Sequence, residues 1–193
     1  MPNSNIISTP YVKIDLNAVE KNIAVMQRIV SDSGQRLRPH IKTHRSIELA
    51  HMQMRAGACG ICCAKLGEAE VMAAGGIQDI LITGTLVGSS KMQRLSRLLN
   101  CANVIVCCDN EVSAKQLSEV GVAAGRRIPV LVELLTHIKR GGVSQDSLLE
   151  FVKLIEQLPG LVFTGLMAYT HPFPFGMTQH SFTGGETPCL SLM

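Results

Sequence analysis

The chain is poor in aromatic residues and in net charge, and both shortages limit what it can bind. Phe, Tyr and Trp together make up 4% of the 193 residues, and Trp is absent. Lys and Arg number 18 against 15 for Asp and Glu, a formal net charge of +3, and the basic residues are scattered along the chain. Few rings that stack on bases and no basic stripe argue against nucleic acid as a partner.

Long apolar runs are also missing. No stretch approaches the ~20 residues that a membrane-spanning helix needs, so we expect no membrane partner. The first ten residues are polar and lack the basic and apolar regions of a secretory signal. We therefore expect a cytoplasmic protein whose seven cysteines are reduced. Cys59-Gly60-Ile61-Cys62 has the spacing of half a zinc site, but no second pair accompanies it, which favours core packing.

What the chain does contain is a regular alternation of short apolar and amphipathic segments from about residue 36 onward. Hydrophobic residues make up 46% and charged residues 17%, as in globular proteins. Amphipathic segments place apolar residues on one helical face, such as Leu148, Val152 and Ile155. The nearly continuous apolar segments are typical of parallel strands buried on both faces. The six predicted strands are Arg38–Lys42, Gly60–Ala64, Asp79–Thr83, Val104–Cys108, Pro129–Leu134 and Val162–Ala168.

Repeated strand–helix units predict an α/β fold with a parallel sheet. A Gly-x-Gly-x-x-Gly turn, typical of doubly wound nucleotide-binding sheets, is absent. We therefore expect a (β/α) barrel, incomplete because about six of the eight units of a closed barrel are present. His171–Gly176 contains two prolines and no regular period. Residues 1–171 are accordingly interpreted as the barrel portion and residues 172–193 as a divergent or truncated tail.

One lysine between two histidines, in Arg38-Pro39-His40-Ile41-Lys42-Thr43-His44, is the strongest candidate for chemistry. On a strand, His40 and Lys42 would point to the same face. One interpretation is a surface lysine with flanking histidines. The other is a lysine that forms a Schiff base with an aldehyde cofactor, a use that requires a neutral amine.

The same heptapeptide resembles the cofactor-lysine segment of the D-threonine aldolase and D-serine dehydratase family. These are pyridoxal-phosphate enzymes with the alanine-racemase type of N-terminal barrel. Gly57–Met72, which includes Cys62-Cys63, is similar to the family's second strand and helix, and Asp79–Ile82 with Val87-Gly88 resembles its third strand and turn. Thr9–Asp15 fits the family's opening strand. The resemblance runs from about Thr9 to Tyr169.

The resemblance implies roles for four residues of the barrel. Lys42 would form the Schiff base with pyridoxal 5'-phosphate, and His40 would hydrogen-bond near the cofactor ring. Arg140 lies in a turn that resembles the family's Arg-x-Gly-Val, whose arginine contacts the ring oxygen through a charge-assisted hydrogen bond. Tyr169 matches a tyrosine of the family's pocket.

Further along, Thr183–Pro188 resembles the family's glycine-rich phosphate cradle, which implies that Gly184, Gly185 and Thr187 bind the cofactor phosphate. Two departures from the family pattern precede Arg140, because Leu135 and His137 replace an acidic residue and a glycine.

The function implied is that of a lyase resembling D-threonine aldolase, which cleaves a D-β-hydroxy amino acid to glycine and an aldehyde. The full-length family also has a C-terminal β domain with a divalent metal site, whose ligands are absent here, so we predict no metal-ligating residue and impaired activity. Three alternatives remain open: a non-catalytic pyridoxal-phosphate-binding homeostasis protein, a D-serine dehydratase-like ammonia-lyase, and a remnant that does not fold alone. The edge strands of an unclosed sheet expose unpaired backbone groups, which also favours a homodimer.

Overall fold

The computed structural model of the chain describes residues 10–169, and its centre is a parallel sheet of five strands. Every neighbouring pair is parallel, and the order of the strands in the sheet is their order in the chain. The strands are β1 (Ile61–Cys63), β2 (Asp79–Ile82), β3 (Asn103–Cys108), β4 (Ile128–Leu134) and β5 (Leu161–Ala168).

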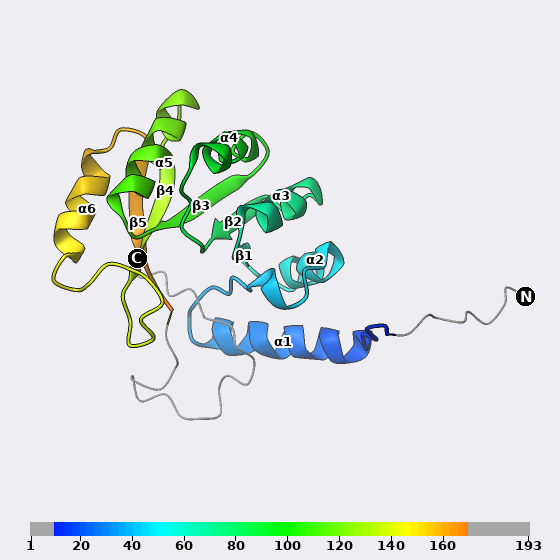
Figure 1. Ribbon diagram of the computed structural model, residues 1–193. Coiled ribbons are helices and arrows are strands. Elements are labelled where there is room, and N and C mark those ends of the chain that lie inside the picture. Colours follow the sequence, from blue (N-terminus) through cyan, green and yellow to red (C-terminus); the bar gives the residue numbers. More distant parts are fainter. Residues whose placement is uncertain (1–9, 170–193) are drawn as a thin grey trace, which may run out of the picture.

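A helix connects each strand to the next, as the sequence alternation predicts. The α-helices are α1 (Leu16–Asp32), α2 (Ile47–Arg55), α3 (Leu66–Ala74), α4 (Ser89–Leu98), α5 (Glu111–Ala123) and α6 (Leu148–Gln157), and a short 3-10 helix, η1 (Ile41–Thr43), precedes α2. Helices α3 to α6 cover the outer side of the curved sheet, while α1 lies beside α2 (Figure 1).

The sequential strand order identifies the sheet as part of a barrel. A doubly wound sheet reverses its strand order at a switch point and carries helices on both faces, whereas a (β/α) barrel adds each strand beside the previous one. In the described sheet each strand lies beside the previous one, as in a (β/α) barrel. The expectation of an incomplete α/β barrel is therefore confirmed, with five strands in place of the six predicted.

Alternation along each strand divides the apolar side chains between two clusters. Ile80 and Ile82 of β2 belong to the large cluster between the sheet and its helices, while Leu81 points to the other face. There it joins a small cluster made by Cys62, Leu81, Cys107, Leu131 and Met167, all 6% exposed or less. Such a layer of inward side chains fills the interior of this type of barrel.

The paired cysteines are packing residues, as expected. Cys62 and Cys63 are both buried, Cys62 in the inner cluster and Cys63 in the outer one. Burial, and then the charge of Glu68, raise the pKa of the Cys63 thiol to about 12. A thiol that stays protonated at neutral pH behaves as a small hydrophobic side chain.

The first predicted strand, Arg38–Lys42, is wrong. The backbone of this segment runs beside β1, where Cys62 N donates to Pro39 O (2.7 Å), but a single bridge between His40 and Cys62 replaces a strand. Pro39 has no N–H to donate to a ladder. Immediately afterwards His40 Nδ1 accepts the N–H of Lys42 (3.3 Å), which draws residues 41–43 into η1.

The predicted opening strand, Thr9–Asp15, is also wrong for its described part, since Pro10–Asp15 lie outside any helix or strand. Val12 is 89% exposed, and a β-strand needs a neighbour for its backbone hydrogen bonds. Asp15 instead caps α1, because its carboxylate accepts the N–H groups of Asn17 and Ala18.

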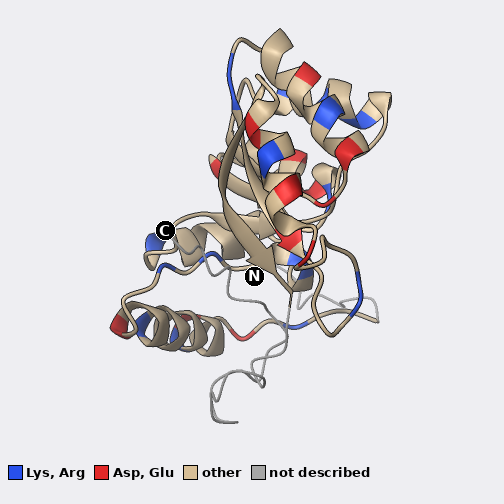
Figure 2. Ribbon diagram, turned by 90° about the vertical axis from the view of Figure 1, so that its left-hand side faces the viewer, with Lys and Arg blue, Asp and Glu red and all other residues tan. Residues whose placement is uncertain are grey.

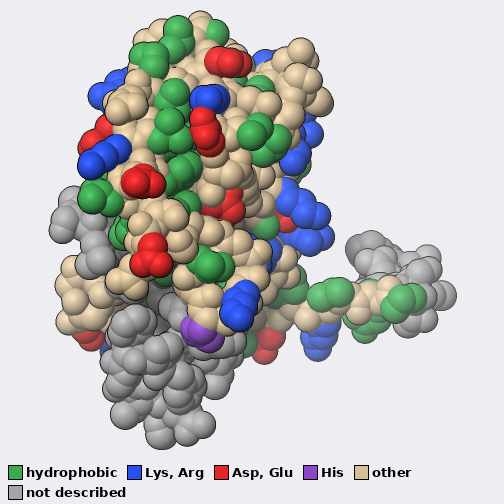
Figure 3. Space-filling model, turned by 60° about the vertical axis from the view of Figure 1, so that its left-hand side comes forward, with side chains coloured by type: hydrophobic (Ala, Val, Ile, Leu, Met, Phe, Trp, Pro, Cys, Tyr) green, Lys and Arg blue, Asp and Glu red, His purple; other side chains and the backbone are tan. Residues whose placement is uncertain are grey.

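Charged side chains lie on the helices and loops, while the sheet is largely uncharged (Figure 2). On the face shown in Figure 3, both signs of charge are interspersed with hydrophobic groups. In residues 10–169, no helix is long and apolar enough to cross a membrane.

The closest packing of a helix on the sheet predicts one unusual mutational effect. An added Cβ on Gly121 of α5 would lie 2.2 Å from Gly160 O, just before β5. Gly→Ala inside a helix normally stabilises by about 1 kcal/mol. Here we expect Gly121→Ala to lower the free energy of unfolding by about 1–3 kcal/mol through overpacking, measured by urea denaturation.

Val122→Ala is the matched control, because Val122 is the next residue of α5 and is 56% exposed. It should change stability by less than about 0.5 kcal/mol. A Gly121→Ala variant as stable as the parent would show that α5 does not press against the start of β5.

Candidate functional site

A pocket opens at the carboxyl ends of the strands, the edge at which (β/α) barrels place their active sites. Its walls come from segments far apart in the chain. Thr83 follows β2, Tyr169 follows β5, and Arg140 lies in the turn after β4. The lining residues are His40, Lys42, Cys62, Leu81, Thr83, Arg140, Met167 and Tyr169.

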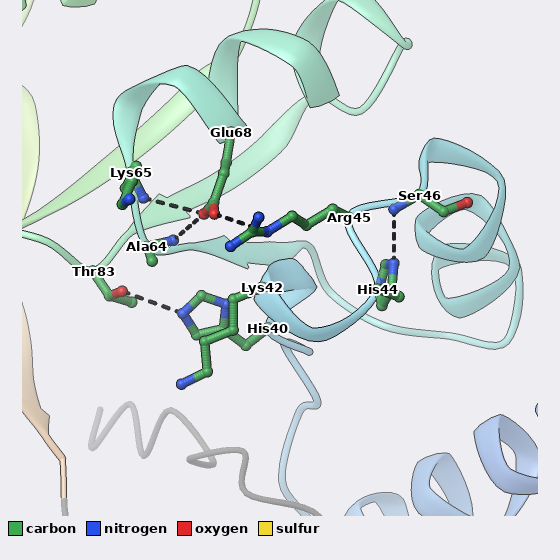
Figure 4. Close-up of polar contacts among 9 residues, drawn as sticks. All are labelled: His40, Lys42, His44, Arg45, Ser46, Ala64, Lys65, Glu68 and Thr83. Atoms are coloured by element: carbon green, nitrogen blue, oxygen red, sulfur yellow. Dashed lines mark hydrogen bonds and ion pairs between the residues drawn. The ribbon is translucent and has the colours of Figure 1, made fainter. Parts of the chain in front are cut away.

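The His40 ring has a hydrogen-bond partner on each nitrogen, and the contact with Thr83 is drawn in Figure 4. Its Nδ1 accepts the Lys42 N–H at 3.3 Å, and its Nε2 lies 3.5 Å from Thr83 Oγ1. Thr83 Oγ1 in turn donates to Cys63 O at 3.2 Å. Because Nδ1 is the acceptor, the neutral ring carries its proton on Nε2, directed at the Thr83 oxygen.

The surroundings of His40 keep this ring neutral. The pKa of His40 is lowered from 6.5 to about 4, mainly by burial and then by the charges of Lys42 and Arg140, while Glu68 opposes the shift. A protonated imidazole would be a third cation beside an ammonium and a guanidinium. His40 therefore acts at neutral pH as a fixed hydrogen-bonding wall of the pocket.

Glu68 is the structural residue that its place at a helix start suggests. Its carboxylate accepts the N–H groups of Ala64 (2.8 Å) and Lys65 (3.2 Å) in the turn from β1 into α3. Its other oxygen lies 3.7 Å from Arg45 Nε (Figure 4). Arg45 follows η1, so Glu68 ties the segment that carries Lys42 to the end of β1.

Two cations converge on one aromatic ring across the pocket. Lys42 Nζ lies 5.6 Å, and Arg140 Cζ 4.5 Å, from the centre of the Tyr169 ring. Both distances allow a cation–π attraction. Thr136 Oγ1 donates to Tyr169 O at 2.6 Å, which fixes the end of β5 to the turn after β4. The arrangement brings an amine, a guanidinium and a phenol to one small space.

The turn that carries Arg140 closes tightly on the end of β4. Val143 N donates to Glu133 O (2.8 Å) and Leu135 N donates to Val143 O (2.9 Å). Gly142 has φ +106°, and an added Cβ would lie 2.4 Å from the Leu134 carbonyl carbon, so glycine is required there. Leu135 and His137, the two residues that depart from the family pattern, both lie in this turn.

Four of the residues singled out in the sequence, His40, Lys42, Arg140 and Tyr169, thus line one pocket. Gly184, Gly185 and Thr187, and the whole tail from residue 172, lie outside the described residues. Sequence reasoning missed Thr83, although a polar residue at the end of a predicted strand was the signal that could have found it. The apolar lining, Leu81 and Met167, has no signal beyond strand alternation.

No group of three or more His, Cys, Asp or Glu side chains suited to a metal ion occurs in residues 10–169. The pocket is lined by five polar groups. They are the Lys42 amine, the Arg140 guanidinium, the His40 imidazole, the Thr83 hydroxyl and the Tyr169 phenol.

Comparison with known proteins gives the family. The model of the family described as alanine racemase, N-terminal domain, matches residues 14–174. The chain belongs to this family. Its parallel (β/α) sheet is that of the family's fold.

Three of the longer relatives that the chain resembles are named aldolases or a dehydratase. D-threonine aldolase of Arthrobacter sp. is 40% identical over 181 residues, 93% of this chain and 46% of the relative. 3-Hydroxy-D-aspartate aldolase of Paracoccus denitrificans (strain Pd 1222) is 36% identical over 90% of this chain and 44% of the relative. D-threo-3-hydroxyaspartate dehydratase of Delftia sp. (strain HT23) is 34% identical over 73% of this chain and 37% of the relative.

Among solved structures, D-threonine aldolase from Filomicrobium marinum superimposes with a TM-score of 0.80 at 40% identity, covering 83% of this chain and 43% of that one. The chain therefore spans less than half the length of the relatives that it matches.

The neutral His40 predicts a pH dependence of stability. The unfolded chain binds a proton at His40 near pH 6.5, whereas the folded chain does so near pH 4. The free energy of unfolding is therefore highest above pH 6.5. It falls by on the order of 2–3 kcal/mol as the pH drops from 6.5 through 4. His40→Asn retains an acceptor for the Lys42 N–H but does not titrate, so it should lose about 2 kcal/mol less between about pH 7.5 and pH 4.5.

Urea denaturation of both proteins at the two pH values measures this difference. His51→Asn is the control, since it removes a histidine outside the pocket. Equal pH dependence of the parent and His40→Asn would show that His40 is not held neutral by the fold.

Proposed function

We propose that residues 1–171 form the cofactor-binding portion of a pyridoxal-phosphate-dependent lyase that acts on D-β-hydroxy amino acids. One observation supports the proposal above all. Lys42, Arg140 and Tyr169 line one pocket beside a neutral His40, at the carboxyl ends of the barrel strands. The aldolases and the dehydratase similar to this chain support the choice of substrate.

The groups present suit pyridoxal phosphate. An amine can condense with its aldehyde, a guanidinium can hydrogen-bond its anionic ring oxygen, and an apolar floor of Leu81 and Met167 accommodates a flat ring. Gly184, Gly185 and Thr187 are proposed for the phosphate from the sequence pattern alone. When bound, the cofactor supplies an electron sink that stabilises negative charge on the substrate's α-carbon.

The chain's own side chains then have separate tasks. Lys42 would hold the cofactor through its amine, which could also hold a proton near the substrate. Arg140 would hydrogen-bond the ring oxygen, and Tyr169 lies within cation–π distance of both Arg140 and Lys42. His40 orients the turn that carries Lys42 without adding a positive charge.

In an aldolase, the bond between the α- and β-carbons breaks as the β-hydroxyl loses its proton, and glycine and an aldehyde result. Divalent-metal dependence is proposed for the full-length enzyme from the family resemblance, with ligands outside residues 10–169. The second candidate is β-elimination, as in a D-serine dehydratase-like ammonia-lyase, because the Delftia relative is named a dehydratase. A third candidate is non-catalytic cofactor binding, which the same pocket residues would also support.

We further propose a cytoplasmic homodimer. Seven cysteines in one chain suit a reducing compartment. Within the described residues β5 pairs with β4 alone, so its second edge is available to another chain.

Covalent capture of the cofactor tests the proposal directly. Purified chain is incubated with pyridoxal phosphate and reduced with borohydride, and the modified peptide is located by mass spectrometry. We expect one modified site, Lys42, and its loss in Lys42→Ala. Lys65→Ala, which removes an exposed lysine near the pocket, should leave the adduct unchanged.

Modification spread over surface lysines, with no dependence on Lys42, would refute the proposal. Products then separate the reactions: any turnover of D-threonine with added Mn²⁺ would give glycine and acetaldehyde by cleavage, or 2-oxobutanoate and ammonia by elimination. Lys42-dependent binding with neither set of products would favour the non-catalytic alternative.

A further inference from the structure

Asp109 connects three segments at the mouth of the barrel although it is not one of the residues that line the pocket. It directly follows β3, between the ends of β2 and β4. Its Oδ1 accepts Thr85 Oγ1 at 3.0 Å, from the loop after β2, and Asn110 Nδ2 at 2.8 Å. Its Oδ2 accepts the N–H of Gly142 at 3.3 Å, from the turn after β4. One carboxylate thus bridges both neighbouring loops.

The turn that Asp109 reaches is the one that carries Arg140, two residues before Gly142. The backbone there has little freedom, because an added Cβ on Gly142 would meet Leu134 at 2.4 Å and one on Gly141 would meet Asp109 Oδ2 at 3.4 Å. The backbone of Gly142 thus lies close to Leu134 and donates to Asp109 Oδ2. Both contacts lie two residues after Arg140 and limit where its backbone can lie.

The electrostatic interactions of Glu133 also connect Asp109 with Arg140. The pKa of Glu133, at the end of β4, is raised mainly by its burial; Arg140 opposes the shift and Asp109 adds to it. Arg140 thus lies within the electrostatic reach of Glu133, and Glu133 within that of Asp109. A carboxylate that accepts a backbone N–H makes a stronger hydrogen bond than a neutral acceptor would.

We propose that Asp109 is a positioning residue for the cofactor: through the Gly142 N–H it holds the turn so that Arg140 lies against Tyr169, ready for the cofactor's ring oxygen. Thr85 fixes the carboxylate from the opposite side. The proposal rests on the proposed function, since it concerns the cofactor attached at Lys42. A preorganised guanidinium binds with less loss of side-chain entropy than a mobile one.

Cofactor affinity in a double-mutant cycle tests the proposal. The dissociation constant for pyridoxal phosphate is measured by absorbance titration for the parent, Asp109→Ala, Arg140→Ala and the double variant. Asp109→Ala should weaken binding by about tenfold, as expected for a lost charged hydrogen bond. If Asp109 acts through Arg140, its removal in the Arg140→Ala background should weaken binding no further.

Asp146→Ala is the matched control, because it removes an exposed aspartate from the β4–α6 connection, which also carries Arg140. It should bind the cofactor as the parent does. Asp109→Asn retains the size of the side chain and serves where Asp109→Ala does not fold. Unchanged affinity in both Asp109 variants, or full additivity with Arg140→Ala, would overturn the proposal.

A cofactor-free measurement separates this inference from the proposed function. Amide hydrogen exchange of Gly142, followed by NMR on the chain alone, should be slow in the parent and in Asp146→Ala, and about tenfold faster in Asp109→Ala. Fast exchange in the parent would remove the structural basis of the inference. A slow Gly142 amide in a chain without Lys42-linked cofactor would instead contradict the proposed function alone.

Discussion

The parallel, sequential register of the sheet is the constraint on which the site depends. Because each strand lies beside the one before it and points the same way, the segments that follow β2, β3, β4 and β5 all emerge at one edge. Thr83, Asp109, Arg140 and Tyr169 are spread over 87 positions of sequence, yet they meet there. The apolar alternation of the strands fixes that register, since a shift of one residue would exchange the inner and outer clusters.

The pocket is organised around a surplus of positive charge. Lys42 and Arg140 both face the Tyr169 ring, and the fold keeps His40 from becoming a third cation. Such a site favours an anionic, flat ligand, because an anion neutralises the two cations and a ring stacks near the phenol. The neutral imidazole meanwhile shapes the Lys42 turn through its hydrogen bond, so its role is geometric.

Most of the fold was open to prediction from the sequence, because buried parallel strands and amphipathic helices each leave a clear apolar pattern. Arg38–Lys42 was not, since the extended segment ends at a hydrogen bond that the His40 side chain accepts from the Lys42 N–H, and no pattern of polarity marks such a bond. Lys42 and Arg140 were found through short motifs. The role of Asp109 at the mouth was not predicted, because it lies in contacts with two other loops, and spacing along the chain carries no trace of those contacts.

Glycines that allow backbones to touch lie at both ends of the sheet. Gly60 precedes β1 and approaches Asp79 O, and Gly160 precedes β5 and approaches Ser118 O of α5. Gly84 and Gly142 allow the same close approach at the mouth, to Ala64 O and to the Leu134 carbonyl carbon. Exchange of the mouth loops therefore has to retain these two glycines, so backbone contact limits which loop sequences this frame can accept.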